Sequence, residues 1–163
     1  MKFRIAAALL VLCAGLSACA TKYQDMGFTG GVEATQIDGN TFRITAKGNG
    51  FTRGEAIKDY AMMKAAETTL AAGCDYFIII GQENTSRTTF SSSPGMATST
   101  TTRTGGVATT TTHYSGDDVD EVFKPGQDLT IKVFKGSKPE NNMAAYDARE
   151  VATFLGPKVK GAH

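Results

Sequence analysis

The chain of 163 residues has few of the residue types that most often perform chemistry in proteins, with three cysteines and two histidines. Cys13 and Cys19 belong to the N-terminal segment, and only Cys74 lies in the body of the chain. One body thiol and two histidines do not supply a zinc site or a catalytic triad held in fixed geometry. We therefore expect no enzyme activity, no metal and no other cofactor, and a fold that rests on packing without disulfide bonds.

An excess of basic residues is also missing. The chain has 17 Lys and Arg against 16 Asp and Glu, and loss of Lys2 and Arg4 with the N-terminal segment would leave 15 against 16. Nucleic acids and anionic lipids attract clusters of Lys and Arg, and no such cluster stands out. We expect no nucleic-acid partner and no basic patch that would by itself hold the protein on a membrane.

The N-terminal apolar run is too short to span a bilayer. Residues 5–12 make up roughly half of the ~20 apolar residues that a membrane-spanning helix needs. The run follows Lys2 and Arg4 and is followed by mostly small residues. This order of charged, apolar and small residues is that of an export signal, so residues 1–18 are predicted to be a signal peptide.

The tetrapeptide Leu16-Ser17-Ala18-Cys19 ends this segment. It has the residue order that the lipoprotein signal peptidase reads, which predicts cleavage between Ala18 and Cys19 and a lipid on Cys19. The alternative is an ordinary cleaved signal with Cys19 near the new terminus by chance. Ala20 follows the cysteine in place of an aspartate, which favours sorting to the outer membrane, with the protein anchored through its lipid and facing the periplasm.

The remaining chain predicts one small α+β domain. We expect a lipidated tether over 19–30, a domain over 31–158 and a frayed tail over 159–163. The expected element order is β-β-α-β-loop-β-α, a two-layer arrangement with helices on one face of the sheet. The first two strands, 32–37 and 41–47, form a hairpin, because Asp38-Gly39-Asn40 suits a tight turn.

Local sequence patterns predict the other helices and strands. Thr52 and Glu55 form a capping box for a helix that runs to about Ala72, with Gly73 as its stop. The apolar run 76–80 predicts a central strand buried on both faces, and 129–133 alternates like a half-buried strand. A second helix is expected over 143–155, opened by Asn141 or Asn142 and ended by Gly156-Pro157.

The segment 85–115 is dominated by Ser and Thr. This composition cannot bury enough apolar surface to fold alone, so we favour a mobile loop. Because Thr has high β-propensity, the alternative is a solvated β-ribbon that extends the sheet and whose arms, 98–103 and 107–112, flank Gly105-Gly106. The acidic run 117–121 is expected to form a solvated turn and not a calcium site.

Three other features have structural interpretations. Glu67 lies beside the core face of the first helix and is expected to hold a structural hydrogen bond. The Gly48-x-Gly50 stretch is interpreted as a loop before a helix, because its spacing does not fit a dinucleotide-binding fingerprint. Cys74 is expected to be a buried small residue, since no His or Lys adjoins it in sequence to lower its pKa.

The helix-strand unit contains Tyr60, Ala66, Glu67, Gly73, Asp75 and Tyr76. With these residues it resembles the signature of a family of small uncharacterised proteobacterial outer-membrane lipoproteins. The resemblance covers about 19–83 and 125–158 and omits the Ser/Thr-rich insertion. It implies a location and domain limits, and no activity or catalytic residue.

Two function classes remain open. In the first, the protein is a non-catalytic interaction or structural module of the envelope, with an envelope protein as its partner. In the second, it binds a small ligand or senses envelope stress through a pocket between helix and sheet near Tyr60, Tyr76 and Phe77. A pocket of about 300 Å³ or more there would favour the second class.

Overall fold

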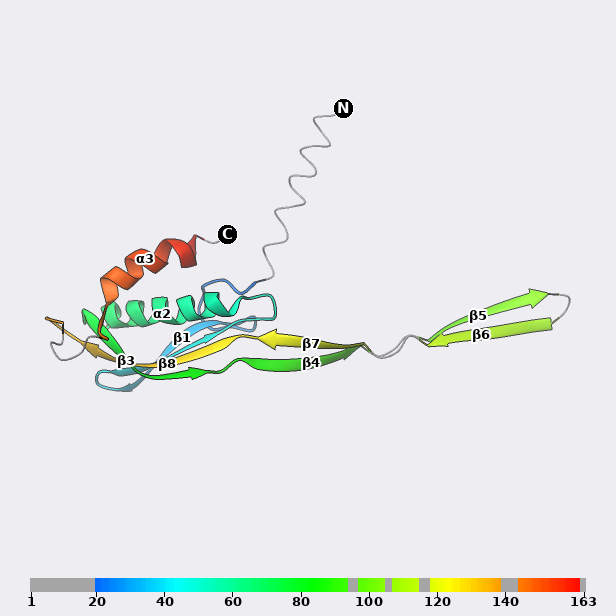
Figure 1. The fold of residues 1–163 in the computed structure, drawn as a ribbon, viewed down its shortest axis with the longest axis horizontal. Coiled ribbons are helices and arrows are strands. Elements are labelled where there is room, and N and C mark those ends of the chain that lie inside the picture. The colour runs from blue at the N-terminus through cyan, green and yellow to red at the C-terminus, as the bar shows by residue number, and fades with distance from the viewer. Residues whose placement is uncertain (1–19, 94–96, 105–106, 115–117, 139–143, 162–163) are drawn as a thin grey trace, which may run out of the picture. The chain divides into compact units, whose positions relative to one another are not determined.

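The computed structural model describes residues 20–93, 97–104, 107–114, 118–138 and 144–161. The chain divides into two units. The first, called the compact unit, is made of Met1–Arg87 with Phe123–His163, and the second of Thr88–Val122. The first unit combines an antiparallel sheet with helices, which confirms the predicted α+β class (Figure 1).

In the described residues, five strands form the sheet of the first unit in the order β1-β2-β8-β3-β9, and each pair of neighbours is antiparallel. The predicted hairpin is confirmed, and the Asp38 carboxylate accepts a hydrogen bond of 3.0 Å from the backbone N–H of Asn40 in its turn. The strands are β1 (Gly31–Asp38), β2 (Thr41–Lys47), β3 (Tyr76–Asn84), β8 (Gly126–Phe134) and β9 (Tyr146–Asp147).

The central strand is β8 and not β3. Leu129, Ile131 and Val133 alternate along β8 and are all buried. The antiparallel partners of Leu129 and Ile131 on one side are Ile44 and Phe42 of β2, and Phe77 of β3 pairs with Val133 on the other. This period of two places one face of the sheet in the core.

The prediction that 76–80 is buried on both faces is wrong. Phe77 is fully buried, but Ile80 is 55% exposed. Among the described residues, α2 and α3 both lie on one face of the sheet (Figure 1), so alternate residues of β3 face away from them. The register with β8 also shifts between Ile79 and Gly81, which leaves Ile80 as an extra residue in the strand.

Helix α2 (Gly54–Ala71) lies between the sheet and helix α3 (Ala148–Lys160), in contact with both (Figure 1). Adjacent residues, such as Tyr60 with Ala61 and Ala65 with Ala66, are both buried. Because neighbours on a helix point about 100° apart, burial extends around more than one side. Besides the row that contains Tyr60, Met63 and Ala66, a second row is buried, which contains Ile57, Ala61, Ala65 and Thr69.

The end of α2 follows its prediction. Gly73 has φ +70°. Its N–H donates to the Leu70 carbonyl, and the Cys74 N–H donates to the Thr69 carbonyl, both at 3.0 Å. These two bonds form the Schellman motif, which satisfies carbonyls that the last turn leaves without partners.

The start of α2 does not follow its prediction. Arg53 is the N-cap residue and its side chain makes no capping hydrogen bond. The hydroxyl of Thr52 instead donates to the Asn49 side chain at 2.9 Å and accepts the backbone N–H of Thr21 at 2.8 Å. The capping-box prediction is wrong because the Thr52 hydroxyl is hydrogen-bonded to Thr21, a residue distant in the sequence, and to Asn49.

The predicted limits of the second helix are also wrong. Asp147 caps α3, and its carboxylate accepts the N–H groups of Arg149 and Glu150 at 2.9 and 3.1 Å. Asn141 and Asn142 lie outside the described residues. The helix continues through Gly156-Pro157 to Lys160, so residues 159 and 160 of the predicted frayed tail are helical.

Contacts with α2 explain this continuation. Val159 is buried, Lys158 pairs with Asp59 at 2.6 Å, and Lys160 pairs with Glu67 at 2.7 Å. A proline inside a helix loses one backbone hydrogen bond and strains the preceding turn. The burial of Val159 and the two ion pairs offset that cost.

The Ser/Thr-rich segment forms strands, so the favoured mobile loop is wrong. The alternative β-ribbon is right in its pairing and wrong in extending the sheet, because in the described residues these strands form two separate two-stranded sheets. β4 (Arg87–Ser93) pairs with β7 (Asp118–Lys124), and β5 (Ala97–Thr104) pairs with β6 (Val107–Tyr114). The acidic residues 118–121, predicted as a turn, belong to β7, and Asp117 lies outside the described residues.

Candidate functional site

The candidate site begins where the described chain begins, beside the predicted lipidation residue. Ala18 and Cys19 lie outside the described residues. Thr21, two residues beyond Cys19, is only 3% exposed. The expected tether over 19–30 is therefore wrong for the stretch from Thr21, which packs on the folded unit. We call residues 21–30 the N-terminal clasp.

Thr21 is the centre of the clasp. Its hydroxyl donates to the Thr29 carbonyl at 2.6 Å and accepts the Asn49 N–H at 3.0 Å. Its carbonyl accepts the hydroxyl of Tyr60 at 3.0 Å, and its own N–H donates to Thr52. A buried polar residue is stable only when its hydrogen-bonding groups have partners, and these bonds join Thr21 to the helix and to the loop before it.

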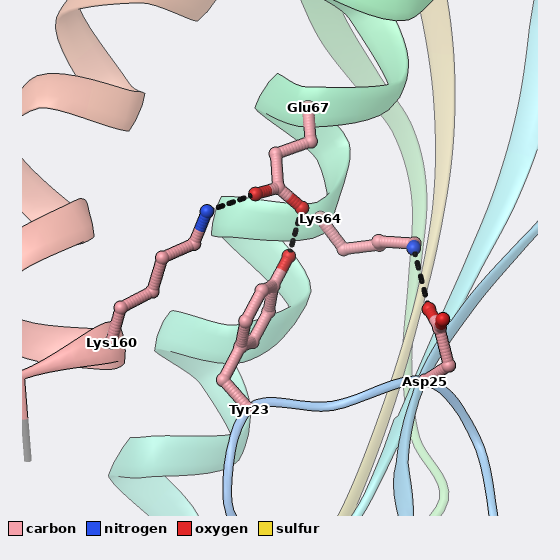
Figure 2. A network of polar contacts seen from close by, with 5 residues as sticks. All are labelled: Tyr23, Asp25, Lys64, Glu67 and Lys160. Carbon is pink, nitrogen blue, oxygen red and sulfur yellow. Dashed lines mark hydrogen bonds and ion pairs between the residues drawn. The ribbon is translucent and has the colours of Figure 1, made fainter.

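A second set of polar contacts holds the clasp further along α2 (Figure 2). The Tyr23 hydroxyl donates to the Glu67 carboxylate, and Lys160 of α3 approaches the other oxygen of that carboxylate at 2.7 Å. Lys64 pairs with Asp25 at 3.3 Å. The expectation that Glu67 makes a structural hydrogen bond is confirmed: it links the clasp to both helices.

Aromatic packing reinforces this link. The rings of Tyr23 and Tyr60 meet edge to face with centroids 5.5 Å apart, and the Lys160 ammonium lies 5.8 Å from the Tyr23 ring centre. Burial, with a further contribution from the hydrogen bond to Glu67, raises the pKa of Tyr23 far above its ordinary value. Tyr23 therefore stays protonated and acts as a donor at any physiological pH.

Glycine allows the clasp to turn back into β1. Gly30 and Gly31 have φ of 103° and 138°. A Cβ at Gly30 would collide with the Lys47 carbonyl oxygen, and one at Gly31 would lie 2.6 Å from the Asp25 carbonyl oxygen. These glycines allow close backbone packing. In the sequence alone, their presence in a polar segment is typical of a flexible linker.

An open cleft of about 620 Å³ lies next to the clasp, between α2 and the β1–β2 hairpin. Lys64 and Glu67 belong both to the clasp contacts and to its wall. Polar and apolar side chains share the lining, which comprises Ala34, Gln36, Gly39, Phe42, Lys64, Glu67, Thr68, Ala71 and Ala72.

The pocket predicted at Tyr60, Tyr76 and Phe77 does not form. Tyr60 and Phe77 are buried in the packed core. Tyr76 instead lines a separate groove of about 460 Å³ beside α3, together with Tyr146 and Phe154. The cleft between helix and sheet lies elsewhere, next to the clasp, and no local sequence pattern pointed to it.

The remaining sequence candidates have structural surroundings. Asp75 accepts the Gly136 N–H at 2.9 Å and pairs with Arg149 at 3.0 Å. The hydrogen bond from Gly136, followed by the charge of Arg149, holds the pKa of Asp75 below its ordinary value. Cys74 is half-buried. A Cβ at Gly48 would lie 2.8 Å from Cβ of Thr52, so this glycine serves packing in a loop before α2.

Within the described residues, no helix has the length and apolar character to cross a membrane, and no group of three or more Asp, Glu, His or Cys side chains is placed to bind a metal ion. Comparison with protein-family models, curated proteins and solved structures found no match.

Proposed function

We propose that this protein is an outer-membrane lipoprotein, held by a lipid on Cys19 and facing the periplasm, whose folded part is a non-catalytic interaction or structural module. The observation that carries the proposal is Leu16-Ser17-Ala18-Cys19. It is supported by the burial of Thr21, since a signal peptide has to end before the packed part of the mature domain. Two or more acyl chains make membrane attachment effectively permanent.

The Ser/Thr-rich ribbon is the part of the molecule that we assign to an envelope partner. In the described residues, β5 and β6 pair only with each other. Thr98, Thr100 and Thr111 are exposed, and so are their described neighbours. Unpaired strand edges offer backbone donors and acceptors to another chain, and an isolated two-stranded ribbon gains stability when a further strand joins it.

Labelling with palmitate tests the anchor. The Cys19→Ala chain should incorporate no label and accumulate as the uncleaved precursor, because the acyl acceptor is absent. The matched control is Cys74→Ala, which alters the only other cysteine expected in the mature chain and should be labelled like the wild type. Continued labelling of Cys19→Ala would refute the proposed anchor.

Sorting tests the proposed location separately. Placing aspartate directly after the lipidated cysteine, as in Ala20→Asp, should move the protein from the outer to the inner membrane fraction on a density gradient. Lys22→Asp is the matched control, since it adds the same side chain two residues further on. An outer-membrane location for both variants, or for neither, would contradict the sorting prediction.

A second candidate function is the binding of a small amphiphile, which the cleft of about 620 Å³ beside the clasp supports. The cleft exceeds the lower limit of about 300 Å³ for small-molecule sites. Native mass spectrometry of the protein extracted from membranes should then show a bound species that Ala71→Trp removes and Ile37→Trp retains. An unliganded mass for the wild type would exclude this function.

A further inference from the structure

One large aromatic side chain is exposed in the clasp and a second in the loop before α2. Phe28 is fully exposed, and Phe51 is 74% exposed. Exposing a phenylalanine to water forgoes the free energy of burying its ring. Single exposed apolar residues are ordinary on protein surfaces, so the position of these two residues relative to the rest of the chain decides whether they form a site.

Both phenylalanines adjoin residues that bind Thr21. Phe28 precedes Thr29, whose carbonyl accepts the Thr21 hydroxyl at 2.6 Å. Phe51 precedes Thr52, whose hydroxyl accepts the Thr21 N–H at 2.8 Å. The two rings therefore belong to two loops that are joined through the same buried residue.

Thr21 also fixes the point where the chain leaves the folded unit. Consecutive Cα atoms are 3.8 Å apart, so Cys19 lies within about 8 Å of Thr21 in any conformation. A lipid on Cys19 consequently enters the membrane close to both loops. The packed clasp leaves no spacer that would let the folded unit move away from the bilayer.

Two basic side chains accompany Phe51. Lys22 and Arg53 are exposed and line the same hollow as Ala20 and Phe51. In the sequence the two basic residues are 31 positions apart, so they form no run that charge counting would detect. Basic residues close to an anionic leaflet are attracted to its phosphate groups.

We propose that Phe28 and Phe51 enter the interfacial layer of the membrane beside the lipid of Cys19 and fix the orientation of the compact unit on a phospholipid surface. This inference rests on the lipid anchor of the proposed function. The acyl chains supply the attachment, while a single point of attachment leaves the domain free to rotate. Two inserted rings with adjacent basic groups restrict that rotation.

Tryptophan fluorescence tests the insertion, because the chain contains no tryptophan. Phe28→Trp and Phe51→Trp place single reporters in the two loops. Ile37→Trp is the matched control, since Ile37 is 50% exposed at the turn of the hairpin. That turn faces the C-terminal end of α2, whose 18 residues span about 27 Å from the end nearest Thr21.

Each lipidated full-length variant is incorporated into phosphatidylethanolamine–phosphatidylglycerol vesicles that contain lipids brominated on the acyl chains. We expect emission from the residue 28 and 51 reporters to move to shorter wavelength and to be mostly quenched. Emission from the residue 37 reporter should match that in vesicles without bromine. Far-UV circular dichroism checks that the substitutions, all at exposed positions, leave the fold intact.

Vesicle flotation separates failure of this inference from failure of the anchor. If the variants float and the reporters at 28 and 51 are no more quenched than the one at 37, the insertion is refuted and the anchor stands. Equal and strong quenching at all three positions also refutes it, because it shows a domain without fixed orientation. Variants that do not float refute the anchor and this inference together.

Discussion

The compact unit and the Ser/Thr-rich ribbon use opposite means to form β-structure. In the sheet of the compact unit, β8 alternates buried Leu129, Ile131 and Val133 with residues of the open face, and α2 covers the buried face. In the ribbon, exposed hydroxyls meet across β5 and β6, with Ser99 and Thr112 at 2.9 Å and Thr101 and Thr110 at 2.8 Å.

The difference shows that the same secondary structure has different sources of stability in one chain. Burial of apolar area contributes most of the stability of the compact unit. The ribbon is stabilised by backbone pairing, the β-propensity of threonine and cross-strand hydroxyl contacts. Each cross-strand contact contributes a fraction of a kcal/mol to about 1 kcal/mol to its stability. Substitutions in the compact unit should therefore have large effects on stability, and changes in the ribbon should have small ones.

The largest effect is expected for Phe77→Ala. Phe77 is fully buried and stacks on Tyr146 with ring centroids 5.3 Å apart. Truncating a buried phenylalanine costs about 3–5 kcal/mol through lost burial and the cavity left behind. Urea denaturation measures the change, and Phe90→Ala, at a 67% exposed residue of β4 in the second unit, should stay within about 0.5 kcal/mol. Equal losses for both variants would remove the distinction between the units.

Gly30→Ala should have the next largest effect. The residue has φ 103°, and a Cβ would meet the Lys47 carbonyl oxygen. Such backbone strain costs about 1–3 kcal/mol, measured as a lower midpoint of urea denaturation. Gly39→Ala is the matched control, because a Cβ there meets no atom within 4 Å and its φ is not positive. A wild-type midpoint for Gly30→Ala would mean that the clasp contributes no stability.

A smaller, pH-dependent effect is expected for Asp75→Asn. The pKa of Asp75 is lowered in the folded state, so its carboxylate stabilises the fold above the unfolded pKa of about 3.9. That contribution is lost as pH falls through the lower folded value. The variant should be less stable than the wild type at pH 7, and the difference should shrink toward pH 3. A difference that does not change with pH would assign the effect to packing.

The smallest effect is expected for deletion of residues 96–112. The compact unit takes none of its buried core from this stretch, so its thermal midpoint should be unchanged. Differential scanning calorimetry measures this midpoint. A decrease of more than a few degrees would show that the ribbon stabilises the compact unit.

Local sequence signals predicted those elements whose determinants are adjacent in the chain. The β1–β2 hairpin depends on Asp38-Gly39-Asn40, and the end of α2 depends on Gly73, and both are found as expected. The alternation in 129–133 also identified β8. These features follow from backbone geometry within a few residues.

Tertiary contacts decided the rest. The clasp has the polar, glycine-containing composition of a linker, and only its fit to Thr52, Tyr60 and Glu67 reveals its packing. The same contact removes Thr52 from its predicted capping role. Pro157 is a strong stop signal within its own segment, but ion pairs with α2 extend the helix beyond it. Partners 30 or more residues away leave no local pattern.

The burial of Thr21 sets an order of events in the maturation of this protein if Cys19 is lipidated as proposed. A peptidase and acyltransferases need an extended substrate around the residue that they modify. Thr21 makes its hydrogen bonds only when the chain has closed on Thr29, Thr52 and Tyr60. Processing of the precursor should then precede closure of the clasp, and premature folding of the N-terminal region would compete with lipid attachment.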